Sequence, residues 1–252
     1  LTILVEGEEE SGSVNLPGYI KANAAELKAD YALVCDTGMW DRETPLITST
    51  LRGMVYQEVT LTAADRDLHS GLFGGAAANP IHLLARILGE IHDETGRITI
   101  PGFYEGVHEP TNAQKAEWAD LNLTEKEFLG QVGLKHSVGE KGRMLIEQIQ
   151  SRPTCDVNGI WGGYTGEGSK TVIPGKASAK VSFRLVGDQD PAKIAAAFHQ
   201  FSGIAEGNRR VVHRGLLAFR HCRPAIGRGR RSNAPRAGAR GDRSSPACGR
   251  RS

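Results

Sequence analysis

The chain has 252 residues, of which 39% are hydrophobic and 24% charged, the ordinary balance of a globular protein with its own core. It contains no run of about 18 apolar residues, and its start lacks the pattern of a secretory signal, so we expect neither a membrane span nor secretion. The four cysteines stand far apart and form no CxxC pair, which predicts a reducing, cytoplasmic compartment.

Charge divides the chain near residue 207. Residues 1–207 hold 18 Lys and Arg against 28 Asp and Glu, whereas residues 208–252 hold 13 Arg, no Lys and one acid. The second block fits a nucleic-acid-binding arm, a disordered tail, or out-of-frame translation of GC-rich DNA. Because evolved basic tails usually mix Lys with Arg, the missing lysine favours the frame error, and we do not expect nucleic acid as a partner.

The first predicted element is a short buried strand at Thr2–Val5. Four glutamates follow it within five residues, Glu6, Glu8, Glu9 and Glu10. Carboxylates crowded at a strand end repel one another, and a bound cation, a shared proton or full solvation would relieve that repulsion. Ligands of open α/β sheets bind at the carboxyl ends of strands, so this cluster is the first candidate site.

A predicted helix starts at Leu16 behind the cap Asn15, and a second buried strand, Tyr31–Cys35, ends at Asp36. Strand–helix–strand units give parallel neighbours, which would bring the glutamates and Asp36 to one sheet edge. There, one carboxylate could bind a metal while another takes a proton from metal-activated water. The alternatives are a solvated acidic loop and, for Asp36, a turn residue.

After a linker at Thr44–Thr50, a second unit is predicted to begin with an alternating strand at Gly53–Ala64. A polar loop at Asp65–Gly75 precedes a helix that starts at Asn79-Pro80 and runs to about Ile91.

Residues 96–160 are less regular, with a capping box at Thr124 and Glu127 and a helix predicted at Glu140–Gln150. A Gly-rich loop at Trp161–Ser169, an alternating strand at Lys176–Val186 and a helix from Asp190 to about Phe201 complete a small α+β sandwich.

Two side chains in this second unit are candidates for catalysis or substrate binding. His69, in the polar loop, could donate a hydrogen bond to an oxyanion, or be an ordinary surface histidine. Arg184, in the last predicted strand, could clamp a carboxylate through two hydrogen bonds, or simply face solvent.

Four motifs together carry a family resemblance: EGEEESGS, DTGMW after YALVC, DLHSG, and GEGSKTVIPGKASAKVSFRLV. Their order and spacing resemble the di-zinc metallopeptidases related to aminoacylase, glutamate carboxypeptidase and acetylornithine deacetylase. The resemblance is closest to the cytosolic non-specific dipeptidase, or carnosinase-like, branch, and it extends from residue 1 to about residue 205.

The resemblance implies a role for each matching residue. Glu9 matches the general base, and Glu10 and Asp36 match ligands to the two zinc ions, for which Mn²⁺ or Co²⁺ could substitute. His69 matches a lid histidine that stabilises the oxyanion in the partner subunit's site. Thr171 matches a substrate-contacting position, and Arg184 the residue that pairs with the substrate's carboxylate.

The implied fold class is α/β. Residues 1–47 would be a fragment of the catalytic metal-binding domain, with a parallel-type sheet and helices. Residues 48–207 would form an inserted α+β lid and dimerisation domain, through which we expect a homodimer, and residues 208–252 the Arg-rich tail. Since three of the family's five zinc-ligand side chains have no counterpart here, we expect the chain as written to be inactive.

The predicted parent enzyme hydrolyses dipeptides. The alternatives are an N-acyl-amino-acid deacylase of the same superfamily and, outside the enzymes, a non-catalytic dimerisation module or a basic-tailed nucleic-acid binder.

Overall fold

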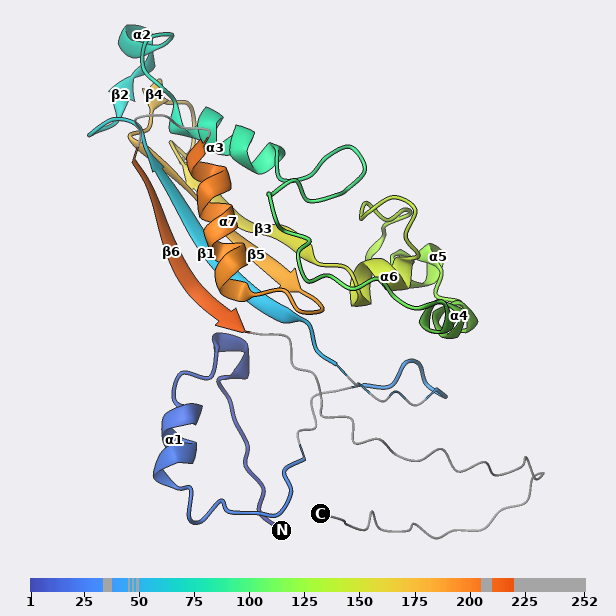
Figure 1. Ribbon diagram of the computed structural model, residues 1–252. Helices are drawn as coiled ribbons and strands as arrows, with labels where there is room; N and C mark the ends of the chain where they lie inside the picture. The colour runs from blue at the N-terminus through green and yellow to red at the C-terminus, as the bar shows by residue number, and fades with distance from the viewer. Residues whose placement is uncertain (34–37, 45, 47, 49, 205–209, 220–252) are drawn as a thin grey trace, which may run out of the picture. The chain divides into compact units, whose positions relative to one another are not determined.

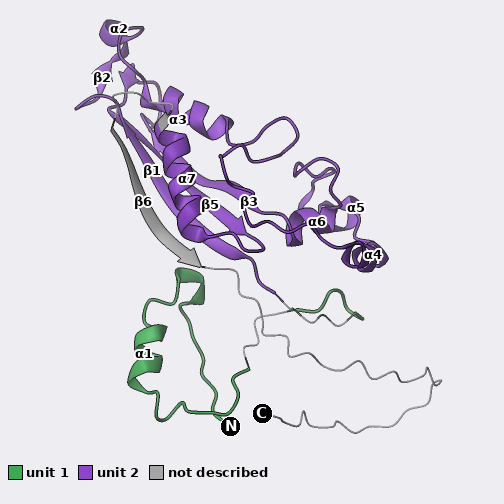
Figure 2. Ribbon diagram, in the orientation of Figure 1, with its two compact units in different colours: residues 1–48 green, residues 49–252 purple. Residues whose placement is uncertain are grey.

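The computed structural model describes residues 1–33, 38–44, 46, 48, 50–204 and 210–219, with side chains up to residue 203. The chain divides into two compact units, Leu1–Thr48 and Ser49–Ser252 (Figure 2). Each unit is considered by itself below.

Unit 1 contains a short 3-10 helix, η1 (Glu9–Ser11), and one α-helix, α1 (Leu16–Ala22). The strand predicted at Thr2–Val5 is wrong, because these residues have no regular structure and are mostly exposed. A β-branched run needs a hydrogen-bonded neighbour to become a strand, and the described part of unit 1 offers none. Part of the second predicted strand, together with Asp36, lies outside the described residues.

Unit 2 is built on a four-stranded antiparallel sheet in the order β3-β5-β1-β6 (Figure 1). Its strands are β1 (Gly53–Thr62), β3 (Thr154–Gly162), β5 (Lys176–Leu185) and β6 (Arg210–Phe219). The central pair, β1 and β5, is in register from Gly53 opposite Leu185 to Thr62 opposite Lys176. The α+β architecture predicted for this unit is therefore confirmed.

Helices α3 (Pro80–Gly89) and α7 (Pro191–Ile204) pack on one face of the sheet (Figure 1). The alternation in β1 follows from this, since every second residue is buried against the helices while its neighbours stay partly exposed. Asn79 caps α3 as predicted, because its side chain accepts a hydrogen bond from the Ile81 N–H at 3.0 Å. The buried core includes Val55, Val59, Leu84, Ile87, Phe103, Phe183 and Phe198.

Between α3 and β3 lies an insertion of short helices, α4 (Asn112–Asp120), α5 (Glu125–Phe128), η2 (Gly130–Val132) and α6 (Leu145–Gln150). The capping box at Thr124 and Glu127 is confirmed at the start of α5. The helix predicted at Glu140–Gln150 is shorter than expected, and β3 and α4 were missed. The register of β3 shifts between Val157 and Gly159, which breaks the alternation that would have revealed the strand.

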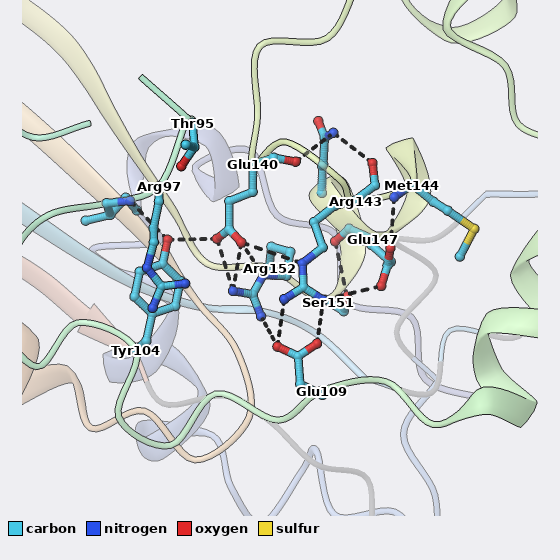
Figure 3. A network of polar contacts seen from close by, with 12 residues as sticks. Thr95, Arg97, Tyr104, Glu109, Glu140, Arg143, Met144, Glu147, Ser151 and Arg152 are labelled. Atoms are coloured by element: carbon cyan, nitrogen blue, oxygen red, sulfur yellow. Dashed lines mark hydrogen bonds and ion pairs between the residues drawn. The ribbon is translucent and has the colours of Figure 1, made fainter. Parts of the chain in front are cut away.

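A network of ion pairs holds the insertion together (Figure 3). Arg152 is only 3% exposed and pairs with Glu140 at 2.8 Å and Glu109 at 3.1 Å. Arg143 also binds Glu109, and the Tyr104 hydroxyl donates to Glu140 at 2.7 Å. Since Arg152 immediately precedes Pro153 and the start of β3, this network fixes the point where the chain re-enters the sheet.

Among the described residues, no helix has the length and apolar composition needed to cross a bilayer. The described backbone at the C-terminal end stops at Phe219, the last residue of β6.

Candidate functional site

His69 and Thr171 lie together on a small ribbon at one end of the main sheet. The ribbon pairs β2 (Leu68–His69) with β4 (Val172–Ile173), and His69 stands opposite Val172. The Ser70 N–H extends the pairing by donating to the Thr171 carbonyl at 3.1 Å. As a result, the Thr171 hydroxyl oxygen is 3.4 Å from His69 Nε2, although 102 positions separate the two residues.

The imidazole of His69 has a defined orientation. Its Nδ1 accepts a hydrogen bond from the Gly71 N–H at 2.9 Å, at the start of the short helix α2 (Ser70–Phe73). Because Nδ1 accepts, a neutral ring carries its proton on Nε2. The exposed Nε2–H can therefore donate to an acceptor outside the ribbon, with Thr171 beside it.

Two glycines make this arrangement possible. A Cβ on Gly71 would lie 2.8 Å from His69 Cε1, so a larger residue would displace the ring. A Cβ on Gly175 would lie 3.1 Å from backbone atoms of Ala64 and Arg66. The Gly175 N–H donates to Asp67 Oδ1 at 2.9 Å, and this contact ties the loop before His69 to the start of β5. The DLHSG motif thus contains the candidate histidine and two residues that position it, Asp67 and Gly71.

Arg184 lies at the other end of β5, exposed on the face of the sheet that α3 and α7 leave open. It stands opposite Met54 on β1 and Thr154 on β3. Arg52, just before β1, interacts electrostatically with Arg184 and Asp156. Burial lowers the pKa of the Arg52 guanidinium, and the positive charge of Arg184 lowers it further, while Asp156 opposes both effects.

The structure brings His69 and Thr171 together but keeps Arg184 apart from them. The ribbon joins the sheet at Lys176, and Arg184 follows eight residues later along a regular strand, which corresponds to about 26 Å. Figure 1 shows β2 and β4 at one end of the sheet, with β5 running away from them. A fully extended dipeptide spans only about 7 Å, so one molecule cannot touch both ends of the same lid.

Glu9 and Glu10, two of the residues predicted at the metal site of unit 1, are exposed. Glu9 and Glu10 form the first turn of η1, whereas the neighbouring Glu8 accepts hydrogen bonds from the backbone and side chain of Asn15. Carboxylate oxygens are suitable zinc ligands, but a zinc site needs at least three protein ligands. Within the described ranges, no group of three or more His, Cys, Asp or Glu side chains could hold an ion. These residues therefore do not form a metal centre by themselves.

The M20 peptidase dimerisation domain matches residues 51–206, which cover strands β1, β3 and β5 of the sheet, both helices and the His69 ribbon. The chain belongs to this M20 peptidase family. The assignment confirms the expected metallopeptidase resemblance, and the matched dimerisation domain corresponds to the α+β fold of unit 2.

Three M20-type relatives illustrate the similarity. The chain is 34% identical to the Cys-Gly metallodipeptidase of Saccharomyces cerevisiae over 78% of the present chain. It also matches the structure of that yeast dipeptidase with a TM-score of 0.74, over 86% of the present chain and 46% of the yeast chain. It is 30% identical to the Beta-Ala-His dipeptidase of Rattus norvegicus over 76% of its length. An M20 metallo-carboxypeptidase from Sulfolobus solfataricus matches with a TM-score of 0.68 and 36% identity, over 82% of this chain and 47% of that one.

The chain spans 41% of the yeast relative and 39% of the rat relative. The sequence analysis did not single out Arg52, Asp67, Gly71 or Asp156. Asp67 and Gly71 stand within the DLHSG motif, whereas nothing in the sequence near Arg52 or Asp156 indicates that they lie beside Arg184.

Proposed function

We propose that the chain supplies the lid and part of the catalytic unit of a metal-dependent dipeptidase. The observation that carries the proposal is the His69–Thr171 pair, in which the exposed Nε2–H makes only a long contact of 3.4 Å to Thr171, in a chain whose relatives are named dipeptidases. The substrate is a dipeptide with a free carboxylate.

His69 and Thr171 act on the carbonyl under attack. When a nucleophile adds to the scissile carbonyl, negative charge develops on its oxygen, and the Nε2–H of His69 donates a hydrogen bond to that oxyanion. Thr171 contacts the substrate beside it. Because the Gly71 N–H occupies Nδ1, the ring presents its donor without having to change tautomer during the reaction.

The distance between Arg184 and the His69 ribbon supports a homodimer. Since one dipeptide cannot span the two ends of a lid, Arg184 binds the carboxylate of one substrate while His69 and Thr171 serve the site of the partner subunit. The sheet offers a strand for pairing with a second lid, because the edge strand β3 exposes Val157, Ile160 and Trp161. Edge-to-edge pairing of two β3 strands is the proposed contact.

A pair of zinc ions is the proposed cofactor, with Glu10 and Asp36 among the ligands; when bound, it polarises the carbonyl and acidifies water. Glu9 takes the proton from the attacking water and returns it to the leaving amine. Residues 1–47 and 48–207 are the proposed catalytic and lid parts, and the compartment is the cytosol. The 252-residue chain is expected to be inactive alone, since its described residues contain no group of three or more side chains that could hold a metal ion.

A chimera tests the proposal. Residues 51–206 replace the corresponding domain of the yeast Cys-Gly metallodipeptidase, and Cys-Gly hydrolysis is measured with zinc or manganese added. We expect turnover, with a loss of about 100-fold in kcat for His69→Asn, the magnitude typical of one oxyanion donor. His82→Asn, an exposed histidine on α3, is the matched control. Hydrolysis of N-acyl amino acids with no dipeptide turnover would instead favour the deacylase.

A further inference from the structure

Arg184 has a second guanidinium beside it. In an antiparallel pair of strands, each residue has a directly opposite partner. The residue two positions before or after that partner lies on the same face as a diagonal neighbour, with Cα atoms about 7 Å apart. Arg184 stands opposite Met54, and Arg52 lies two positions before Met54 on the same chain. The alternation of β1 places odd-numbered residues against the helices, so Arg52 belongs to the open face with Arg184.

One acidic side chain, Asp156, faces the two cations in the described part of the protein. It lies on β3, two positions from Thr154, the register partner of Arg184, so by the same diagonal rule it is a neighbour of Arg184 on the open face. Its carboxylate already accepts a hydrogen bond from the Thr154 hydroxyl at 3.1 Å. Strand β3, which carries Asp156, is two strand spacings, about 10 Å, from β1, which Arg52 immediately precedes. Arg184 lies between them on β5.

Two guanidinium groups and one carboxylate leave one net positive charge at this end of the open face. Arg52 is partly buried and adjacent to a like charge, and both effects destabilise its charged form. Arginine remains protonated near neutral pH, so the repulsion persists until a negative group enters. A carboxylate has two oxygens in one plane, which allows each oxygen to accept from a different guanidinium.

We propose that Arg52 and Arg184 together bind the substrate's carboxylate, with one guanidinium on each oxygen. The inference rests on the proposed dipeptidase function and deepens it, because it makes Arg52 a second determinant of selectivity for substrates that end in a free carboxylate. Asp156 limits the net charge of the site, which disfavours anions with more than one charge.

The test is a direct binding measurement on the 252-residue chain by calorimetric titration. The probes are glycylglycine and glycylglycinamide, which differ in the carboxylate alone. We expect glycylglycine to bind about tenfold more tightly, and Arg52→Gln and Arg184→Gln each to remove most of that preference, as expected for charge-assisted hydrogen bonds. Arg66→Gln is the matched control, because Arg66 is exposed near the ribbon and pairs with Asp65.

The outcomes separate the inference from the function. If Arg184→Gln abolishes the preference and Arg52→Gln leaves it intact, the role of Arg52 is overturned while the function of Arg184 stands. If the unmodified chain has no preference for the carboxylate, both assignments fail. Arg52→Lys guards against misfolding, since it keeps the positive charge and a donor for one oxygen. We expect this variant to retain part of the preference, and a complete loss would overturn the charge-based role of Arg52.

Discussion

His69 Nε2 lies 3.4 Å from the hydroxyl oxygen of Thr171, and the two residues are held together by a ribbon of four paired residues. The contact is long for a hydrogen bond, so Thr171 does not saturate the donor. The donor therefore remains available to a ligand, and its direction depends on the backbone of both short strands. The predictions below test the elements that maintain this geometry and the fold around it.

The ring of His69 should lose its fixed tautomer in Gly71→Ala. The added Cβ would meet the ring at 2.8 Å and displace it from the Gly71 N–H. We expect the ¹⁵N shifts of the ring to change from a predominantly Nε2-protonated form toward a mixture of tautomers. The control is Gly89→Ala, at a position with open space around the new methyl group. Unchanged shifts in Gly71→Ala would mean that the Nδ1 contact does not hold the ring.

Arg152→Met should destabilise unit 2 more than Arg143→Met does. Removing the 3%-exposed Arg152 leaves the carboxylate of Glu140, itself 11% exposed, with only the longer ion pair to Arg143 at 3.8 Å. Breaking a buried pair in this way costs about 3 kcal/mol, whereas the more exposed Arg143 should cost about 1 kcal/mol. Urea unfolding followed by circular dichroism measures both. Equal losses would show that burial does not set the cost in this network.

Stability should fall as the pH rises from about 10 to 12, with Tyr104 responsible for part of the loss. Burial raises the pKa of Tyr104 to about 12, and its hydrogen bond to Glu140 adds to that effect, while the Ile98 N–H opposes it. Between the unfolded and folded pKa values the unfolded state binds fewer protons, so the free energy of unfolding decreases with pH. Tyr104→Phe removes this titration, so the difference in free energy of unfolding between the unmodified protein and the variant should shrink above pH 10. A constant difference across that range would contradict the raised pKa.

Ile160→Lys should weaken the proposed dimer. Ile160 is 55% exposed on the edge strand β3, where a lysine would disfavour pairing with a second strand. Sedimentation velocity over a range of concentrations should show at least about a tenfold increase in the dissociation constant. Val132→Lys, at an exposed position in η2, is the control. If both variants associate as the unmodified chain does, β3 is not the contact.

Local patterns predicted the elements whose side chains alternate or cap in a regular way. The stripe of Val55, Val59 and Leu61 identified β1, and the Asn79-Pro80 pair identified the start of α3, because both signals lie within a few residues. Edge strand β3 gave no such signal, since a register shift at Gly159 interrupts it and few of its residues are buried.

Contacts between distant residues could not be read from spacing. The proximity of His69 and Thr171 depends on a ribbon that closes across 102 positions, and the sequence indicated the role of Thr171 through family resemblance alone. The same applies to Arg152, whose partners lie 12 and 43 positions away. The roles of Glu9, Glu10, Asp36, His69, Thr171 and Arg184 stay predictions.

The strand order has a consequence for the synthesis of the protein. The register partner of Thr62, at the end of β1, is Lys176, 114 positions later, and the other neighbour of β1 is β6. At about 5 to 20 residues per second, β1 leaves the ribosome roughly 6 to 23 seconds before its first partner strand begins to appear. During that interval its apolar stripe has no sheet to join. We therefore expect nascent unit 2 to depend on chaperones, and codons that slow translation before residue 176 should increase its aggregation.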